Sequence, residues 1–239
     1  MNRVFNIVLF AYNFSHRKTI DFIKTLYKNQ YKVSLIIAAN HIYIKSPRSR
    51  FKFKSYQPQE TISELVKMYG IPFHVSKHNS EKTKLLIQKY KINFGIISGA
   101  RIINCDIINC IKYGILNFHP GLLPIIRGLD SILWSIYYDQ NIGVTAHLIS
   151  KKIDSGFLVY QEKIKVCIDD DIYSLYEKNY QLQLKLIPIS LNLITEKQDF
   201  KLLEHNGPYN TKMSYLKQLD VVEIIDQYIN RYSKIDEKN

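Results

Sequence analysis

The sequence is poor in cysteine and contains no hydrophobic run long enough to cross a membrane. Its three cysteines, Cys105, Cys110 and Cys167, are odd in number and include no CxxC pair. This pattern indicates neither a disulfide framework nor a zinc site, so we expect no bound metal and a reducing compartment, the cytoplasm. Apolar runs such as residues 33–39 have the length of a strand and fall short of the roughly 20 residues that a transmembrane helix needs. We therefore expect no contact with a membrane.

Internal repeats and low-complexity segments are also missing from the sequence. At the N-terminus, Arg3 precedes an apolar stretch over residues 4–11 and so imitates a signal peptide. Asn6 interrupts that stretch, and a segment with helical periodicity follows directly. We interpret residues 4–11 as the first strand of the core.

The chain is strongly basic. It carries 33 Lys and Arg residues against 21 Asp and Glu residues, which gives a formal net charge of +12. Such a charge is typical of proteins with a polyanionic partner. Here the basic residues are spread along the chain and accompany abundant Ile, Asn and Tyr, which indicates a compositional bias. We expect no nucleic-acid groove, although the charge favours capture of a phosphorylated small molecule.

Hydrophobic periodicity alternates between strand and helix along most of the chain. The length of 239 residues and the hydrophobic content of 46% suit one large domain, alone or with a small appendage. Alternating strands and helices are typical of the α/β class. We predict a Rossmann-like, open, mostly parallel twisted sheet with a small C-terminal extension. The predicted strands cover residues 4–11, 31–39, 71–75, 93–98, 114–118, 143–150 and 157–166, and the predicted helices cover residues 16–29, 59–69, 80–90, 102–111, 130–138 and 171–195.

Three segments depart from this regular pattern. Residues 40–58 are basic and lack clear periodicity, so we predict a long surface loop that is a candidate for function or disorder. Pro188 lies inside the last predicted long helix and should kink or interrupt it. After residue 200 the chain becomes polar and aromatic, with an amphipathic segment over residues 219–232. We therefore predict a catalytic domain over residues 1–200 and an extension over residues 201–239.

Four linked blocks of polar and glycine residues follow the predicted strand at residues 114–118. Residues 116–128 read LNFHPGLLPIIRG, residues 143–147 read GVTAH, and residues 153–156 read IDSG. The first block begins where that strand ends, and ligands of open parallel sheets bind beyond the carboxyl ends of strands. In order, spacing and residue type, these blocks resemble the catalytic core of the 10-formyltetrahydrofolate-dependent formyltransferases. The resemblance is strong over residues 90–166, whereas the N-terminal third matches only by its βαβ pattern.

This resemblance implies an N-formyltransferase that uses N10-formyltetrahydrofolate as the formyl donor and needs no metal. Transfer of a formyl group to an amine passes through a tetrahedral species with an oxyanion, which needs hydrogen-bond donors and a proton acceptor. Asn117 matches the family residue that donates an amide hydrogen to the oxyanion. His119 can donate a second hydrogen bond or a proton, and Asp154 can accept the proton of the amine and hold His119 in its protonated state.

Each of these residues also has a purely structural interpretation. Asn117 could tie down a loop, His119 could be a satisfied polar group before a proline, and Asp154 could be a turn residue before Ser155. We favour the catalytic interpretation for all three. His147 is a candidate for catalytic support, and a hydrogen-bonded core histidine has nearly equal weight there.

A second stretch, residues 95–109, resembles the family segment that forms the folate pocket. The matching positions are Arg101, Ile102 and Ile103, near which backbone groups would bind the pterin. Together with the loop that contains Ser150 and Ile153, they would enclose the ring between two strand ends. The structural alternative is a buried strand that runs into a surface helix.

The identity of the formyl acceptor depends mostly on residues outside the strong resemblance. Glycinamide ribonucleotide formyltransferases have a glycine-rich phosphate loop after the first strand, whereas residues 12–16 here read YNFSH. Methionyl-tRNA formyltransferases carry a C-terminal domain of about a hundred residues, and only a short tail follows residue 200 here. The loop RGLDSILWSIYYDQNIGVTAHL is most similar to sugar N-formyltransferases that act on nucleotide-linked 4-amino-4,6-dideoxy sugars.

We therefore predict an enzyme of surface polysaccharide (O-antigen, lipopolysaccharide) synthesis that formylates such a sugar nucleotide, with dTDP-4-amino-4,6-dideoxyglucose as the expected substrate. Tyr209 would stack on the base, and Arg127, Lys212 or the basic loop would neutralise the pyrophosphate. The family resemblance also implies a homodimer. The alternatives are an enzyme of the methionyl-tRNA formyltransferase type and a non-catalytic module that binds a sugar nucleotide or RNA. The sequence leaves open the nucleotide base, the position of the amine and the stereochemistry of the sugar.

Overall fold

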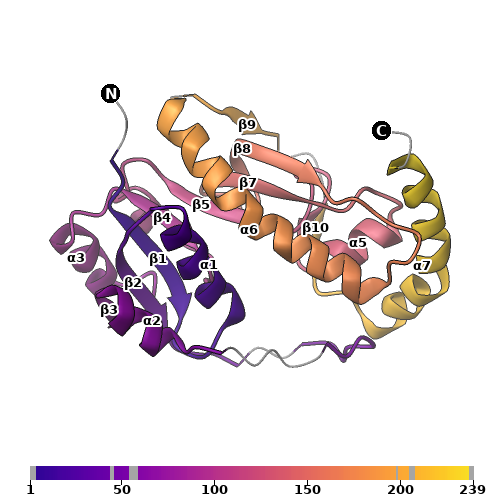
Figure 1. The fold of residues 1–239 in the computed structure, drawn as a ribbon, viewed down its shortest axis with the longest axis horizontal. Coiled ribbons are helices and arrows are strands. Elements are labelled where there is room, and N and C mark those ends of the chain that lie inside the picture. The colour runs from indigo at the N-terminus through magenta and orange to yellow at the C-terminus, as the bar shows by residue number, and fades with distance from the viewer. Residues whose placement is uncertain (1–3, 44–45, 54–58, 198, 205–207, 237–239) are drawn as a thin grey trace.

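The computed structural model describes residues 4–43, 46–53, 59–197, 199–204 and 208–236. Its main feature is an eight-stranded sheet with the order β3-β2-β1-β4-β5-β7-β8-β9 (Figure 1). The predicted α/β class with an open, mostly parallel sheet is confirmed. The strands are β1 (Ile7–Tyr12), β2 (Val33–Ala39), β3 (Phe73–Val75), β4 (Phe94–Ile97), β5 (Ile115–His119), β7 (Gly143–Ile149), β8 (Gly156–Lys163) and β9 (Lys201–Leu203).

The half of the sheet formed by β1 to β5 is parallel, and its inner strands β1, β2 and β4 are largely buried on both faces. Alternate residues of β1 belong to two separate cores, with Leu9 in one and Phe10 in the other. Helices α1 (Arg17–Lys28) and α2 (Ile62–Tyr69) contribute to the first core, and α3 (Glu81–Lys89) and α4 (Cys105–Ile108) contribute to the second. Because the strands run parallel, their carboxyl ends meet at one edge of the sheet, where ligands of this fold class bind.

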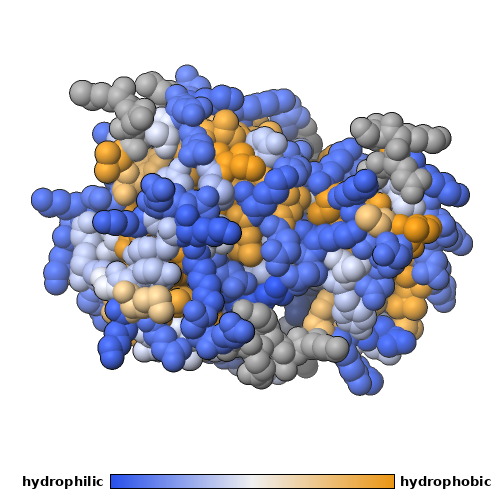
Figure 2. All heavy atoms as spheres, in the orientation of Figure 1, coloured by the Kyte–Doolittle hydropathy of each residue, from blue (hydrophilic) through white to orange (hydrophobic). Residues whose placement is uncertain are grey.

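The other half of the sheet is antiparallel, and α6 (Ile172–Glu196) packs against it (Figure 1). Strand β7 pairs with β5 and β8, and β9 joins the outer edge of β8. Helices α5 (Ser131–Tyr137) and α7 (Tyr215–Asp236) pack against each other beyond this half. Most of the face in Figure 2 is hydrophilic, and its apolar residues form separate patches.

The helix interruption expected at Pro188 does not occur, since α6 continues through this residue. Proline inside a helix costs about 3 kcal/mol because a backbone hydrogen bond is lost. Leu186, Ile187, Leu191 and Ile194 flank Pro188 and are fully buried, and each such side chain contributes about 1.5–3 kcal/mol. Packing of α6 on the sheet therefore outweighs the local preference of proline.

Two further segments differ from the sequence-based prediction. The helix expected over residues 102–111 is only α4, because Asn104 caps it by accepting a hydrogen bond from the backbone of Ile107. Residues after 200 add β9 to the main sheet and β10 (Tyr209–Asn210), which pairs with β6 (Arg127–Gly128). The domain boundary at residue 200 remains a prediction. Strands β9 and β10 both pair with strands that precede this residue.

The basic loop after β2 lies partly outside the described residues. Within residues 46–53, the backbone of Arg50 donates a hydrogen bond to Gln218 of α7, and Phe53 packs against Tyr173 and Tyr176 of α6. The loop therefore reaches across to the opposite half of the molecule (Figure 1). Among the described helices, none is both long and apolar enough to span a membrane. The three cysteines are free and partly exposed.

Candidate active site

Strand β5 carries the two central polar side chains of the site. Asn117 and His119 are two residues apart, so they lie on the same face of the sheet, at the carboxyl end of the strand. The register of β5 and β7 places Asn117 opposite His147 and His119 opposite Thr145. The antiparallel pairing of these strands thus brings together polar residues that are distant in the sequence.

Asp154 lies in the loop between β7 and β8 and faces His119. Its Oδ1 is 3.4 Å from Nδ1 of His119, and its side chain is largely buried. The backbone of Gly128 donates a hydrogen bond of 2.7 Å to the second carboxylate oxygen. Asp154 itself adopts a left-handed conformation with φ 49°, which the tight turn to Ser155 and Gly156 requires. The structure therefore brings the amide, the imidazole and the carboxylate to one place.

His119 is buried and has a partner at each ring nitrogen. Nε2 donates a hydrogen bond of 2.8 Å to the carbonyl oxygen of Ile126, and the Ser131 hydroxyl lies 3.3 Å from the same nitrogen. Nδ1 is therefore the nitrogen that can exchange a proton with Asp154. Burial lowers the pKa of His119 below its usual 6.5, and the Asp154 carboxylate opposes this shift.

His147 is buried between β5 and the Asp154 loop. Its Nδ1 donates a hydrogen bond of 3.0 Å to the Ser155 carbonyl, so its Nε2 accepts one of 3.1 Å from Asn117. Burial and the nearby His119 lower the pKa of His147 from 6.5 to about 4. A neutral His147 therefore fixes the orientation of the Asn117 amide, and one of the two amide hydrogens of Asn117 remains for another acceptor.

The loop that follows His119 is held by two residues of the antiparallel half. The hydroxyl of Thr145 donates to the carbonyl of Gly121 at 2.7 Å and accepts from the backbone of Leu123 at 3.0 Å. The Gln161 amide donates to Thr145 at 2.7 Å and to the Leu123 carbonyl at 2.9 Å. The Leu123–Pro124 peptide in this loop is cis. These contacts explain the need for a threonine in the GVTAH block.

Strands β6 and β10 bring residues from the end of the chain to this site. Tyr209 pairs with Arg127 in the two-stranded sheet, and its side chain is half exposed. Burial and the Asp154 carboxylate raise the pKa of the Tyr209 phenol, which indicates that the phenol lies near this carboxylate. Arg127 is buried and donates a hydrogen bond of 2.8 Å to the Ile153 carbonyl, whereas Lys212 is exposed.

The residues expected to bind folate are divided between the surface and the core. Ile102 is 61% exposed and Arg101 is also exposed, whereas Ile103 is buried. Both Arg101 and Ile102 line a cavity of about 690 Å³ at the carboxyl ends of the parallel strands. The side chain of Asn79 donates to the Ile102 carbonyl and accepts from the backbone of Asn104, so it holds this stretch in place.

The second loop expected to contact folate, between β7 and β8, is internally bonded. The hydroxyls of Ser150 and Ser155 are 2.9 Å apart. Ile153 is 38% exposed, and its carbonyl is the acceptor for Arg127. Arg127 therefore fixes the backbone next to Asp154. The sequence analysis did not assign this role to Arg127.

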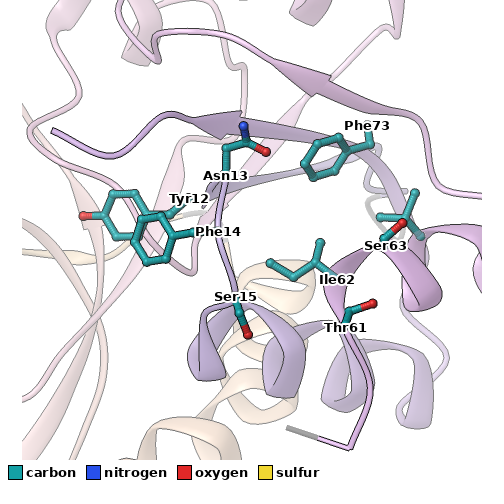
Figure 3. A pocket seen from close by; sticks show the side chains of 9 residues that line it. Tyr12, Asn13, Phe14, Ser15, Thr61, Ile62, Ser63 and Phe73 are labelled. Atoms are coloured by element: carbon teal, nitrogen blue, oxygen red, sulfur yellow. The ribbon is translucent and has the colours of Figure 1, made fainter. Parts of the chain in front are cut away.

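Aromatic residues occupy the turn after β1. The rings of Tyr12 and Phe14 are stacked with centroids 5.1 Å apart, and His16 packs edge-on against both. Phe14 also lines a second cavity, of about 450 Å³, which extends to Ile62 of α2 and Phe73 of β3 (Figure 3). A Cβ atom at Gly99, which follows β4, would lie 2.7 Å from the Tyr12 ring, so this ring would have to shift to admit a larger residue there. The turn after β1 is thus packed by aromatic rings.

Four residues that contact this region were not singled out in the sequence: Lys18, Ser131, Gln161 and Asn79. Each bonds to a residue that is distant in the sequence, so only the fold reveals the contact. Among the described residues, no cluster of three or more His, Cys, Asp or Glu side chains could hold a metal ion.

Comparisons with known proteins identify the family of the chain. A family model described as formyl transferase matches residues 13–191. The methionyl-tRNA formyltransferase of Prochlorococcus marinus (strain MIT 9215) is 29% identical over 150 residues, which are 61% of this chain and 45% of that protein. That of Wolbachia pipientis subsp. Culex pipiens (strain wPip) is 33% identical over 113 residues, 47% of this chain and 38% of the relative. The chain spans about half the length of the curated relatives that it matches.

Solved structures share the fold at low sequence identity. A sugar N-formyltransferase from Shewanella sp FDAARGOS_354 has a TM-score of 0.60 and 20% identity, covering 86% of this chain and 76% of that chain. The phosphoribosylglycinamide formyltransferase from Bacillus Halodurans has a TM-score of 0.61 and 22% identity, covering 81% of this chain and 97% of that chain. The resemblance predicted from the sequence is therefore confirmed. Because the family model matches well over half of its residues, the chain belongs to the formyl transferase family.

Proposed function

We propose that this protein transfers a formyl group from N10-formyltetrahydrofolate to the amino group of a nucleotide-linked amino-dideoxy sugar. The observation that carries the proposal is the convergence of Asn117, His119 and Asp154 at the end of β5, with 3.4 Å between the imidazole and the carboxylate. A group-transfer site needs an oxyanion donor and a proton acceptor within reach of one carbon atom. The three side chains supply both.

In this proposal each residue has one role. The amine nitrogen bonds to the formyl carbon, and the second amide hydrogen of Asn117 is donated to the oxygen that becomes negative. Asp154 accepts the proton that the amine loses and shares it with Nδ1 of His119. The bond between the formyl carbon and N10 then breaks, and that nitrogen takes up the proton from the pair. His147 holds the Asn117 amide in position.

The residues around the cavity lined by Arg101 and Ile102 fit the folate donor. Folate combines a flat ring system with a carboxylate tail, so a site for it needs apolar walls and nearby cations. Tyr12, Phe14 and Ile102 provide apolar walls, and Arg101 and Lys77 provide cations. The volume of about 690 Å³ is in the range of small-molecule sites. When bound, the folate would supply the formyl group, and these residues would orient it.

Two observations favour an amino-sugar nucleotide as the acceptor. The Tyr12–Phe14 stack leaves no glycine-rich backbone for the phosphate of a glycinamide ribonucleotide. Tyr209 is half exposed close to Asp154, so its ring could stack on the base of a nucleotide, with Lys212 exposed nearby in sequence. We propose dTDP-4-amino-4,6-dideoxyglucose, used in surface polysaccharide synthesis, as the substrate. Arg127 would act indirectly in this proposal, because it is buried against the Ile153 carbonyl.

A second candidate is formylation of methionyl-tRNA. The curated relatives that match the chain are named methionyl-tRNA formyltransferases, and the net charge of +12 would suit an RNA acceptor. RNA binding of this kind depends strongly on salt, because cations neutralise phosphates. A tight, salt-dependent affinity for tRNA would favour this candidate over the sugar nucleotide.

The proposal is tested by incubating the chain with N10-formyltetrahydrofolate and each of three acceptors: the dTDP-amino sugar, glycinamide ribonucleotide and methionyl-tRNA. Mass spectrometry should find the N-formyl sugar, together with release of tetrahydrofolate. No product from any aminosugar nucleotide would exclude the sugar assignment. A homodimer also remains a prediction, which light scattering can test.

The site assignment is tested by Asn117→Ala, His119→Ala and Asp154→Ala. Each should lower kcat by about 100-fold or more, because these groups act mainly on the transition state. His74→Ala is the matched control, since His74 lies in the edge strand β3 and bonds to Tyr90, away from β5, and its loss should leave kcat unchanged. Circular dichroism would verify the fold of each variant. Near-wild-type rates in all three site variants would contradict the assignment.

A further inference from the structure

The first turn of α1 places a lysine behind the catalytic strand. Nζ of Lys18 lies 3.5 Å from the carbonyl oxygen of Phe118, the residue between Asn117 and His119. The same ammonium group lies 5.1 Å from the centroid of the Phe22 ring. The side chain as a whole is half-buried, and its charged end is withdrawn into the protein. A cation in such a position is unusual, because desolvation of an ammonium group is unfavourable.

No carboxylate compensates this charge among the described residues. Asp21, one helical turn away on α1, lies 3.4 Å from Arg17 and accepts a hydrogen bond of 2.6 Å from Tyr180. The ammonium group of Lys18 therefore faces a backbone carbonyl and an aromatic ring, both of which leave its positive charge largely unneutralised. The field of this charge extends toward the residues on either side of Phe118.

We propose that Lys18 is a positioning residue for formyl transfer, which, together with the buried Arg127, keeps the imidazole of His119 neutral and ready to take a proton through Asp154. This inference rests on the proposed function of the site. A neutral imidazole beside an ionised carboxylate can take up one proton, whereas an imidazolium cannot. Lys18 thus acts through His119 and need not touch either substrate.

The groups that surround His119 oppose one another. Asp154, from the loop after β7, and the hydrogen bond to the Ile126 carbonyl raise the pKa of His119, whereas Lys18 from α1 and Arg127 from β6 lower it. Burial is the largest influence and also lowers it. His147 from β7 is held neutral by its own low pKa of about 4. Without Lys18 and Arg127, only burial would counter the rise in the pKa of His119 that the Asp154 carboxylate causes.

The charge of Lys18 also affects a second histidine, His16. Burial and Lys18 lower the pKa of His16, which follows β1, from 6.5 to about 4. Lys18 itself has its pKa lowered by burial from 10.5 to about 8, so its charge is present throughout the range where histidines titrate. Its influence on His119 is therefore constant below about pH 7.

The test is Lys18→Met, measured by NMR titration of histidine-labelled protein without substrates. The His119 signal is identified by its loss in His119→Ala. Removal of a nearby like charge should raise the pKa of His119 by about half a unit to one unit. Lys18→Arg retains the charge and should restore the wild-type titration. The matched control is Lys28→Met in the exposed last turn of α1, which should leave the titration unchanged.

The kinetic profile provides a second measurement. The acid limb of kcat/KM should move upward by the same amount in Lys18→Met, which lowers the rate about three- to tenfold at low pH. At pH 8 the rate should differ little. An unchanged His119 pKa in Lys18→Met would overturn the inference, whatever the activity. Because the NMR titration needs no acceptor, failure of the proposed function would not conceal the result.

Discussion

Replacement of Gly128 by alanine should separate strand β6 from its partner β10. Gly128 has φ 92°, and a Cβ atom there would overlap the carbonyl oxygen of Asn210 and lie 2.8 Å from both its backbone nitrogen and its carbonyl carbon. These atoms belong to β10 and cannot move as the end of a flexible side chain does. The two-residue pairing of β6 and β10 must therefore open to admit a methyl group.

Backbone strain and two weakened hydrogen bonds set the magnitude of the effect. A left-handed conformation costs a non-glycine residue about 1–2 kcal/mol. Displacement of β10 would also weaken the hydrogen bond of 2.8 Å from Leu129 to Asn210 and the one of 2.7 Å from Gly128 to Asp154, at about 1 kcal/mol each. We expect a loss of about 3–4 kcal/mol in the free energy of unfolding. Loss of the Asp154 anchor should also lower kcat by about 100-fold.

Gly70→Ala is the matched control. Gly70 ends α2 with φ 62°, and nothing lies within 4 Å of a Cβ atom built there. This variant experiences the backbone strain alone, so it should lose about 1–2 kcal/mol and keep full activity. Urea unfolding followed by circular dichroism measures both variants, and a kinetic assay measures kcat. Equal destabilisation of the two variants, with normal activity in Gly128→Ala, would refute the reasoning.

Two other predictions concern stability. The pKa of His147 is about 4 in the folded protein and 6.5 when unfolded, so its contribution is complete above pH 6.5 and is lost as the pH falls toward 4. In His147→Gln the fall in unfolding free energy over this interval should be smaller by up to about 3 kcal/mol, and an equal fall in both proteins would contradict the assignment. Glu177→Gln breaks a partly exposed pair with Arg17 that joins α6 to α1 at 2.6 and 2.7 Å. It should cost less than about 1 kcal/mol by urea unfolding, and a larger loss would show that this pair is more than a surface contact.

The sequence predicted the elements whose signals are strong and local. Seven of the eight main-sheet strands were expected close to their observed positions, because continuous apolar runs mark buried strands. The convergence of Asn117, His119 and Asp154 followed from the family resemblance. Periodicity alone could not supply it, since the contact depends on the register of β5 against β7.

Other features had no local signal. Strands β6 and β10 have two residues each, too few for any periodicity, and their pairing was therefore missed. Nothing in the sequence distinguishes Lys18 from the other lysines of this basic chain. Only the packing of α1 against the sheet brings it close to Phe118. At Pro188 the expected interruption was wrong, because packing of α6 against the sheet outweighs the local rule; the expected kink stays a prediction.

The parallel pairing of β6 with β10 has a consequence for the order of assembly during synthesis. A ribosome delivers β5 and the Asp154 loop well before Tyr209 and Asn210 emerge. The nascent polypeptide can complete most of its central sheet early, whereas Gly128, which anchors the Asp154 carboxylate, gains its strand partner only after Tyr209 and Asn210 have emerged. Maturation of catalytic competence should therefore lag behind formation of the sheet.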